Sequence, residues 1–363
     1  MIAMCTIYAC TKSPNGPVGP VDGFDKTAML VNYADHLIIP RYQVLQEKLA
    51  ALQTVSEKFM SAPSLTTQAE LRAAYLDAHR QYEKIAVYQF GPAETLLLDN
   101  FANFSGGLDY DFNTAGELTG FSIDTTTIEN NIATGSYDLA KMNRNSFYAQ
   151  GFPALDYLFF APHAVERFTT NPTNRIKYVR DVMARLKSLV DQVSSNWAAY
   201  REEFIANTKT DVGSPIGNMV NQLAYQTDLL KGPRIGWPFG KHSGGLIFAT
   251  KTEAYYAGIS TALAIENLTS LKELYTGAGS RNGLSDYLEA LNQSALNNEV
   301  IAQFNAALAA LQVVPEPLSA AFTAEPAKVE AAYKEIQKLL TLLKTDVASA
   351  TGVQITFTDN DGD

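Results

Sequence analysis

One carboxylate stands out in this 363-residue chain because it interrupts an apolar run. Residues 151–160 read Gly-Phe-Pro-Ala-Leu-Asp-Tyr-Leu-Phe-Phe, with Asp156 as the single charge. Pro153 suits the first turn of a helix, which places it one turn before Asp156 on the same face. A buried carboxylate requires a hydrogen-bonding or charged partner. We expect Asp156 either to lie in a binding site or to form a structural ion pair with an arginine. The arginines considered are Arg80, Arg144 and Arg234.

A second group of versatile side chains lies in residues 234–243, which read Arg-Ile-Gly-Trp-Pro-Phe-Gly-Lys-His-Ser. Glycines in such a segment let the backbone approach a ligand closely. Two interpretations remain open: a loop that lines a pocket, or a tight loop whose aromatic side chains pack in the core. Glu253 follows before the next helical pattern and would face the same space. The candidate ligand-binding residues are Gly151, Asp156, Arg234, Trp237, His242, Ser243 and Glu253.

Metal chemistry is the sharpest function that these residue types allow, because imidazoles and carboxylates that converge bind hard or borderline cations. The sequence contains no His-Glu-x-x-His motif, and its four histidines are widely scattered. We therefore expect a metal site only if the fold brings Asp156 into a cleft with His79, His242 or Glu253. Iron or another divalent metal would then be the cofactor or cargo.

Composition excludes several classes of protein. The formal net charge is −10 and no stretch is rich in lysine and arginine, which argues against nucleic acid and anionic membrane surfaces as partners. Cys5 and Cys10 are the only cysteines, so the body beyond them cannot contain a disulfide, a cysteine zinc site or a thiol nucleophile. A Gly-x-Ser-x-Gly elbow is also absent from the sequence.

The N-terminus resembles the end of a bacterial lipoprotein signal. Residues 1–9 are short, apolar and uncharged, and Ala9 precedes Cys10, as a small residue precedes the lipidated cysteine of such proteins. Residues 11–23 are rich in proline and glycine and suit a tether. We expect Cys10 to be lipidated and to anchor the protein at the bacterial cell envelope, with the true start of the signal upstream. The alternative is a frayed N-terminus with two idle cysteines.

Apolar residues recur at three- and four-residue steps from Asp25 almost to the end, which predicts amphipathic helices. The pattern lapses between Asp99 and Asn145, and a long irregular segment of this kind usually carries function or covers a site. Because 363 residues exceed the usual size of one core, we predict an all-α protein of two helical bundles packed side by side with long connecting loops. The expected divisions are a tether at 1–24, bundles at 25–165 and 166–352, and a tail at 353–363.

Several segments resemble the imelysin family of periplasmic and lipid-anchored bacterial proteins. The family signature is Gly-x-His-x-x-Glu followed by an aromatic residue, and here Gly151 is retained while Pro153 and Asp156 replace the histidine and the glutamate. Three further segments that resemble the family are 32–40, 90–94 and 231–240.

The resemblance implies a role in bacterial iron uptake, with iron, haem or a cell-envelope protein bound between the bundles. We expect a ligand-binding or partner-binding protein without catalytic activity. Two alternatives remain: a metal-dependent peptidase, against which Pro153 argues because its side chain offers no ligand atom, and a protein–protein adaptor without a small-ligand site.

Overall fold

The structure is a computed structural model that describes residues 23–104, 111–112, 118–119, 123–170, 172–279 and 282–357. The predicted lipidation site Cys10 and most of its tether lie outside these residues, so the anchor stays a prediction. Within the described ranges, no helix combines the length and the apolarity that crossing a bilayer requires.

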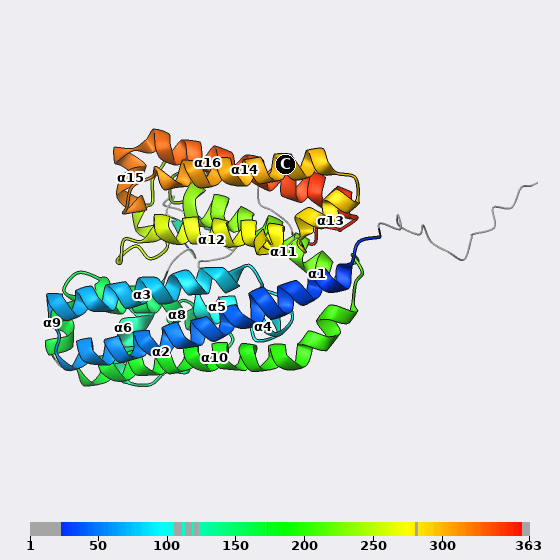
Figure 1. Cartoon of the computed structure of the whole chain (residues 1–363). Helices are drawn as coiled ribbons and strands as arrows, with labels where there is room; N and C mark the ends of the chain where they lie inside the picture. Colours follow the sequence, from blue (N-terminus) through cyan, green and yellow to red (C-terminus); the bar gives the residue numbers. More distant parts are fainter. Residues whose placement is uncertain are drawn as a thin grey trace, which may run out of the picture.

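The first of two helical layers is the lower one in Figure 1. It consists of α1 (Lys26–Asn32), α2 (Ile39–Ser61), α3 (Leu65–Ala86), α4 (Pro92–Thr95), α5 (Leu98–Ala102), α6 (Thr125–Thr134), α7 (Arg144–Phe147), α8 (Gly151–Phe160), α9 (Ala164–Thr169) and α10 (Thr173–Ala206). The long helices α3 and α10 both pack along α2, and α8 lies against α3 and α10.

The second layer lies above the first in the same view (Figure 1). It consists of α11 (Pro215–Leu229), α12 (Ser260–Thr276), α13 (Leu284–Ala290), α14 (Ser294–Gln312), α15 (Leu318–Ala324), α16 (Pro326–Thr341) and α17 (Ala348–Thr351). Helix α14 packs between α16 and α12, and α12 packs against α3 of the first layer. The fold is therefore all-α, as predicted, and the contact of α12 with α3 joins its two bundles.

The boundary between the bundles differs from the predicted one at residues 165 and 166. Helix α10 packs on α2 and α8, and its Arg180 pairs with Glu57 of α2 at 2.6 Å. The first bundle therefore runs to Ala206, and the chain passes to the second bundle through residues 207–214. The apolar stripe of α10 predicts that the helix packs against something, but it does not specify which bundle supplies the partner.

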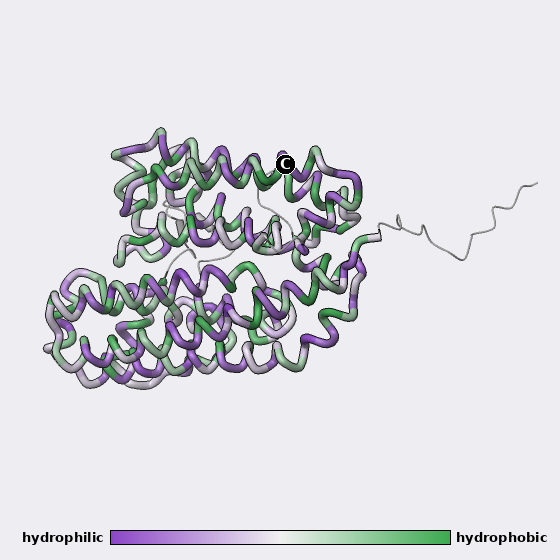
Figure 2. The backbone as a smooth tube through the Cα atoms, viewed as in Figure 1, coloured by the Kyte–Doolittle hydropathy of each residue, from purple (hydrophilic) through white to green (hydrophobic). Residues whose placement is uncertain are grey.

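Helix α3 illustrates how the sequence specifies these elements. Ser64 and Thr67 form a reciprocal capping box at its start, which satisfies two backbone N–H groups that a helix leaves unpaired. Leu71, Tyr75 and Tyr82 then follow at helical spacing and are fully buried. Figure 2 shows the same alternation of apolar and polar positions along the helices of both layers.

The irregular stretches contain several short regular elements. The segment between Asp99 and Asn145 includes the helices α5 and α6, and its strands β1 (Asp111–Phe112) and β2 (Leu118–Thr119) form a two-residue antiparallel ladder. The loop predicted over residues 234–243 is helical in its first part, because α11 continues as a buried π-helical segment over Leu230–Gly236. That continuation carries Arg234 inward.

Candidate metal centre

Helix α3 places an imidazole and a carboxylate side by side at the interface between the bundles. His79 and Glu83 are one helical turn apart, and their side chains are 1% and 0% exposed. The ring of His79 stacks on Phe152 of α8, with the ring centroids 4.3 Å apart and the planes within 9°. This stacking fixes the plane of the imidazole.

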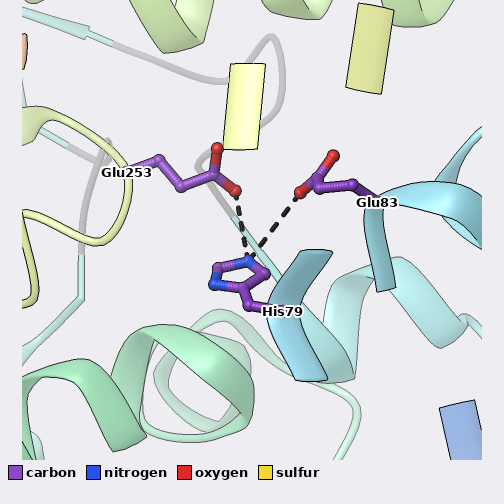
Figure 3. Close-up of side chains that lie close together, drawn as sticks. All are labelled: His79, Glu83 and Glu253. Carbon is purple, nitrogen blue, oxygen red and sulfur yellow. Dashed lines mark ion pairs between the residues drawn. The ribbon is translucent and has the colours of Figure 1, made fainter. Parts of the chain in front are cut away.

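A second carboxylate reaches the same point from the other bundle. Glu253 lies in the turns that precede α12, and its Oε1 is 3.5 Å from His79 Nε2. Glu83 Oε1 is 3.8 Å from the same nitrogen. Figure 3 shows both carboxylates directed at the imidazole from opposite sides. One ligand atom from each of the three residues lies within 4.8 Å of the others.

Buried donors hold oxygens of both carboxylates. Arg234 Nη1 is 2.7 Å from Glu83 Oε2 and 3.4 Å from Glu253 Oε2. Asn267 Nδ2 donates to Glu83 Oε2 at 2.8 Å, and Asn103 Nδ2 donates to Glu253 Oε1 at 2.8 Å. Because Arg234 holds both Oε2 atoms, the two Oε1 atoms are the ones turned toward His79.

Burial and the charge of the Arg234 guanidinium give the two glutamates different pKa values. Burial raises the pKa of Glu83 to about 7, against the opposing charge of Arg234. Burial also acts to raise the pKa of Glu253, but the charge of Arg234, the neighbouring imidazole of His79 and the hydrogen bond from Asn103 overcome it and lower that pKa to about 2. Burial disfavours the charge on Arg234, yet Glu253 and Glu83 together raise its pKa above the ordinary value. At neutral pH the site therefore holds one fixed ion pair and one carboxyl that is ready to lose its proton.

The donor set fits a divalent cation. Both nitrogens of His79 are buried and have no hydrogen-bond partner among the described residues, although a buried polar group normally has one. Imidazole nitrogen and carboxylate oxygen are both ligands that divalent cations take in proteins. Metal–ligand distances of about 2.0–2.2 Å place neighbouring ligand atoms about 3 Å apart. The three ligand atoms, which lie within 4.8 Å of one another, would therefore draw closer together around an ion.

Asp156 lines a cavity of about 220 Å³ beside this cluster. Its carboxylate accepts hydrogen bonds from the backbone N–H groups of Tyr256 at 2.9 Å and Ala257 at 2.7 Å. Its partners are therefore backbone groups rather than one of the three arginines we expected. Burial raises the pKa of Asp156 to about 7, although these two hydrogen bonds and the charge of Arg72 act to lower it. The cavity is lined by His79, Asn103, Phe104, Ile123, Thr125, Pro153, Asp156, Arg234, Thr250, Lys251, Thr252, Glu253, Ala254, Tyr255 and Tyr256.

The first bundle thus holds the Glu253 segment at two further points. Asp156 on α8 accepts from the backbone of this segment, and Arg72 on α3 donates to the carbonyl oxygen of Ala257. Within the second bundle, Ser260 donates to the carbonyl oxygen of Glu253 itself. These bonds orient the turns that carry Glu253 toward His79.

The structure brings together some of the predicted site residues and separates others. Asp156, Arg234 and Glu253 all line the cavity, together with Pro153. The cleft that we required for metal binding therefore exists, with His79 and Glu253 as its members rather than His242.

The other four candidates have structural roles outside the cavity lining. Gly151 has a φ of +69°, and a Cβ there would lie 2.2 Å from the carbonyl oxygen of Ala102. Trp237 is buried and its ring packs against Gly232 and the ring of His242. Ser243 donates to the carbonyl oxygen of Leu246 at 2.7 Å in an exposed turn.

Sequence reasoning did not identify His79 and Glu83 as a pair. The available signal was their spacing of four residues within a predicted helix, one position after the apolar residues Ala78 and Tyr82. Two charged or polar residues so close to an apolar stripe indicate a buried polar pair. The supporting amide Asn103 gave no such signal, because it lies in a stretch without periodicity.

Comparison with known proteins supports the resemblance noted in the sequence. The imelysin family model matches residues 38–345. An imelysin-like protein from Psychrobacter arcticum 273-4 has a similar structure, with a TM-score of 0.71 at 18% identity over 92% of this chain and 97% of that one. An iron-regulated protein A precursor from Parabacteroides distasonis ATCC 8503 gives a TM-score of 0.71 at 17% identity over 92% and 96%. No match was found among curated proteins. Because the family model spans most of its length, the chain belongs to the imelysin family.

Proposed function

We propose that this protein is a non-catalytic ligand-binding protein that holds a divalent cation between its two bundles, with iron(II) as the cargo. The observation that carries the proposal is the buried imidazole of His79, which has no hydrogen-bond partner among the described residues and faces the Oε1 atoms of Glu83 and Glu253. A cation would give this nitrogen a partner and would bind the two Oε1 atoms, which also accept from Asn103 Nδ2 at 3.4 Å and 2.8 Å, respectively.

The ligand chemistry narrows the choice of cation. Imidazole and carboxylate ligands without a thiolate suit iron(II), manganese(II) and zinc(II). Iron is favoured by the name of the structurally similar protein from Parabacteroides distasonis, which describes that protein as iron-regulated. The cavity of about 220 Å³ lies below the range of roughly 300–1,000 Å³ for pockets that hold drug-sized ligands. An ion or a small complex therefore fits better than haem.

We also propose that the protein acts at the bacterial cell envelope through a lipid on Cys10, in iron uptake. The support is the small residue before Cys10, the proline- and glycine-rich residues 11–23 and the family resemblance. Metabolic labelling with a radioactive fatty acid tests the anchor: label should enter the protein and be absent from Cys10→Ser, while Cys5→Ser retains it. Equal labelling of both variants would contradict the anchor.

Equilibrium dialysis of the full chain against iron(II) under anaerobic conditions tests the binding site. We expect one ion per chain, and we expect His79→Gln to bind at least about tenfold more weakly, because a lost ligand is equivalent to about 1.4 kcal/mol or more. His163→Gln is the matched control, since that side chain is 77% exposed and far along the chain from the site. Equal binding by both variants would refute the assignment of His79.

The same protein preparation distinguishes metal binding from the peptidase alternative. The iron-loaded and zinc-loaded proteins are incubated with an unfolded protein substrate, and new N-termini are counted. Cleavage that is lost in His79→Gln and retained in His163→Gln would replace binding by catalysis. An adaptor without a small-ligand site predicts no stoichiometric metal in any variant.

A further inference from the structure

The candidate metal centre lies beside a buried guanidinium, and this inference rests on the proposed metal-binding function. Glu83 and Glu253 supply two negative charges, and Arg234 returns one positive charge between them. A divalent cation would add two positive charges next to this guanidinium, and buried charge is unfavourable unless it is paired.

Other charged groups lie near the centre. The buried carboxyl of Asp99 interacts electrostatically with Arg234, and Tyr82 donates to its Oδ1 at 2.8 Å. Asp156 is engaged by two backbone N–H groups, and the positive charge of Arg72 acts on it. Arg234 and Lys251 are the cationic residues of the described lining, so an anion from outside the protein would meet positive charge there.

The cavity has room for such an anion. Its volume of about 220 Å³ greatly exceeds the roughly 30 Å³ that one water molecule occupies in the liquid. Thr125, Thr250 and Tyr255 are among the residues that line it. These side chains present hydroxyl groups, which can donate to carboxylate oxygens.

A buried donor in the same wall lacks an acceptor. Arg234 is 5% exposed, and its Nε has no hydrogen-bond partner among the described residues, while its Nη1 is used by the two glutamates. A guanidinium presents its donors as a planar fork that matches a carboxylate. An anionic oxygen from a ligand is the group that would satisfy this Nε.

We propose that the cavity takes the cation together with a small polycarboxylate, so that the ligand is a metal–carboxylate complex. One carboxylate of the small molecule completes the coordination of a metal held by His79, Glu83 and Glu253. A second carboxylate is received by Arg234 and the hydroxyl-bearing wall. Arg234, which the sequence predicts as a ligand-binding residue, would thereby bind the anion.

Citrate is the probe, because a chelator has opposite effects in the two cases. The full chain is dialysed against iron(II) alone and against iron(II) with an equimolar amount of radiolabelled citrate. We expect citrate to raise the apparent affinity for iron by at least about tenfold, as one added charge-assisted hydrogen bond would, and to be retained at one citrate per iron. If citrate instead strips iron from the protein and is not retained, the inference is overturned and the metal site stands.

Two variants locate the effect. Arg234→Lys keeps a positive charge near the glutamates but removes the planar fork, so we expect it to lose most of the gain from citrate, measured as the ratio of its own affinities for iron with and without citrate. Lys251→Gln, at the wall of the cavity, serves if Arg234→Lys does not fold, as judged by circular dichroism; it should reduce the gain from citrate, again measured against its own affinity for iron alone.

Further outcomes are also decisive. Citrate retained without iron would make the cavity an organic-anion site and overturn the metal–carboxylate complex. Absence of iron with or without citrate would reject the proposed function and this inference together. A full gain from citrate in Arg234→Lys and Lys251→Gln would place the anion elsewhere and refute the assignment to this wall.

Discussion

Replacing Asp156 by asparagine should make the stability of the metal-free protein fall less steeply as the pH rises. Three effects compete at this carboxyl: burial opposes its charge, whereas two backbone N–H groups and Arg72 favour it. Burial dominates, and the pKa in the folded protein is about 7 against an ordinary value of 3.8. The folded state therefore binds this proton more tightly than the unfolded state does.

The sign and size of the effect follow from this difference. Between about pH 4 and pH 7 the folded protein retains the proton that the unfolded chain has lost, so the free energy of unfolding falls as the pH rises. A pKa difference of this size corresponds to about 4 kcal/mol. Below this window the contribution of the group is fully present, and above it the contribution is absent.

Asparagine is uncharged, like the protonated carboxyl, but its Nδ2 cannot accept a hydrogen bond, so one of the N–H groups of Tyr256 and Ala257 loses its acceptor. Asp156→Asn should therefore be less stable than wild type by about 1–3 kcal/mol near pH 4.5, and the difference should move in favour of the variant by about 3 kcal/mol by pH 8. Comparison with the variant also removes the contribution of Glu83, whose raised pKa acts in the same direction.

Urea unfolding of metal-free protein at half-unit steps of pH measures this difference. Glu47→Gln, at an exposed position of α2, is the control and should follow wild type throughout. A difference between wild type and Asp156→Asn that is constant with pH would refute the reasoning. The reasoning would also be refuted if the free energy of unfolding of wild type rose relative to that of the variant with increasing pH, because the hydrogen bonds and Arg72 would then outweigh burial.

Two further predictions concern the scaffold. Gly151→Ala should lower the free energy of unfolding by more than about 3 kcal/mol, because the added Cβ meets the backbone of Ala102 and φ is positive; urea unfolding that shows a loss below about 1 kcal/mol would contradict the contact. Ser64→Ala should remove about 1 kcal/mol by breaking the capping box with Thr67, whereas Ser61→Ala, outside the box, should have less effect in thermal melts.

The sequence predicts the architecture well because helical periodicity is a local property. The stripe in α10 correctly predicts one helix over Thr173–Ala206. It does not reveal that this helix completes the first bundle, because both bundles offer an apolar face to any amphipathic helix. The pairing with α2 depends on contacts such as Arg180 with Glu57, which are 123 residues apart.

The site was partly predictable for a related reason. Asp156 was identifiable because a charge in an apolar run is unusual, and Arg234 and Glu253 because they border glycine-rich loops. His79 and Glu83 follow ordinary helical spacing, and only the approach of Glu253, some 170 residues later, gives them a function. The sequence predicts Trp237 in the site because it lies close to Arg234 in the chain. The π-helical continuation of α11, which contains Arg234 and ends just before Trp237, has no simple sequence signature.

The division of the cluster between the bundles has a mechanical consequence. His79 and Glu83 move with the first bundle, and Glu253 moves with the second. A cation held by all three residues would hold the two bundles together. By thermodynamic reciprocity, any process that separates the bundles must weaken cation binding by the same free energy. Ligand atoms must lie about 2.0–2.2 Å from the ion, so an opening of the interface that draws Glu253 away would favour release. A partner protein that moves α12 away from α3 could therefore release the cation without contacting any of the residues that bind it.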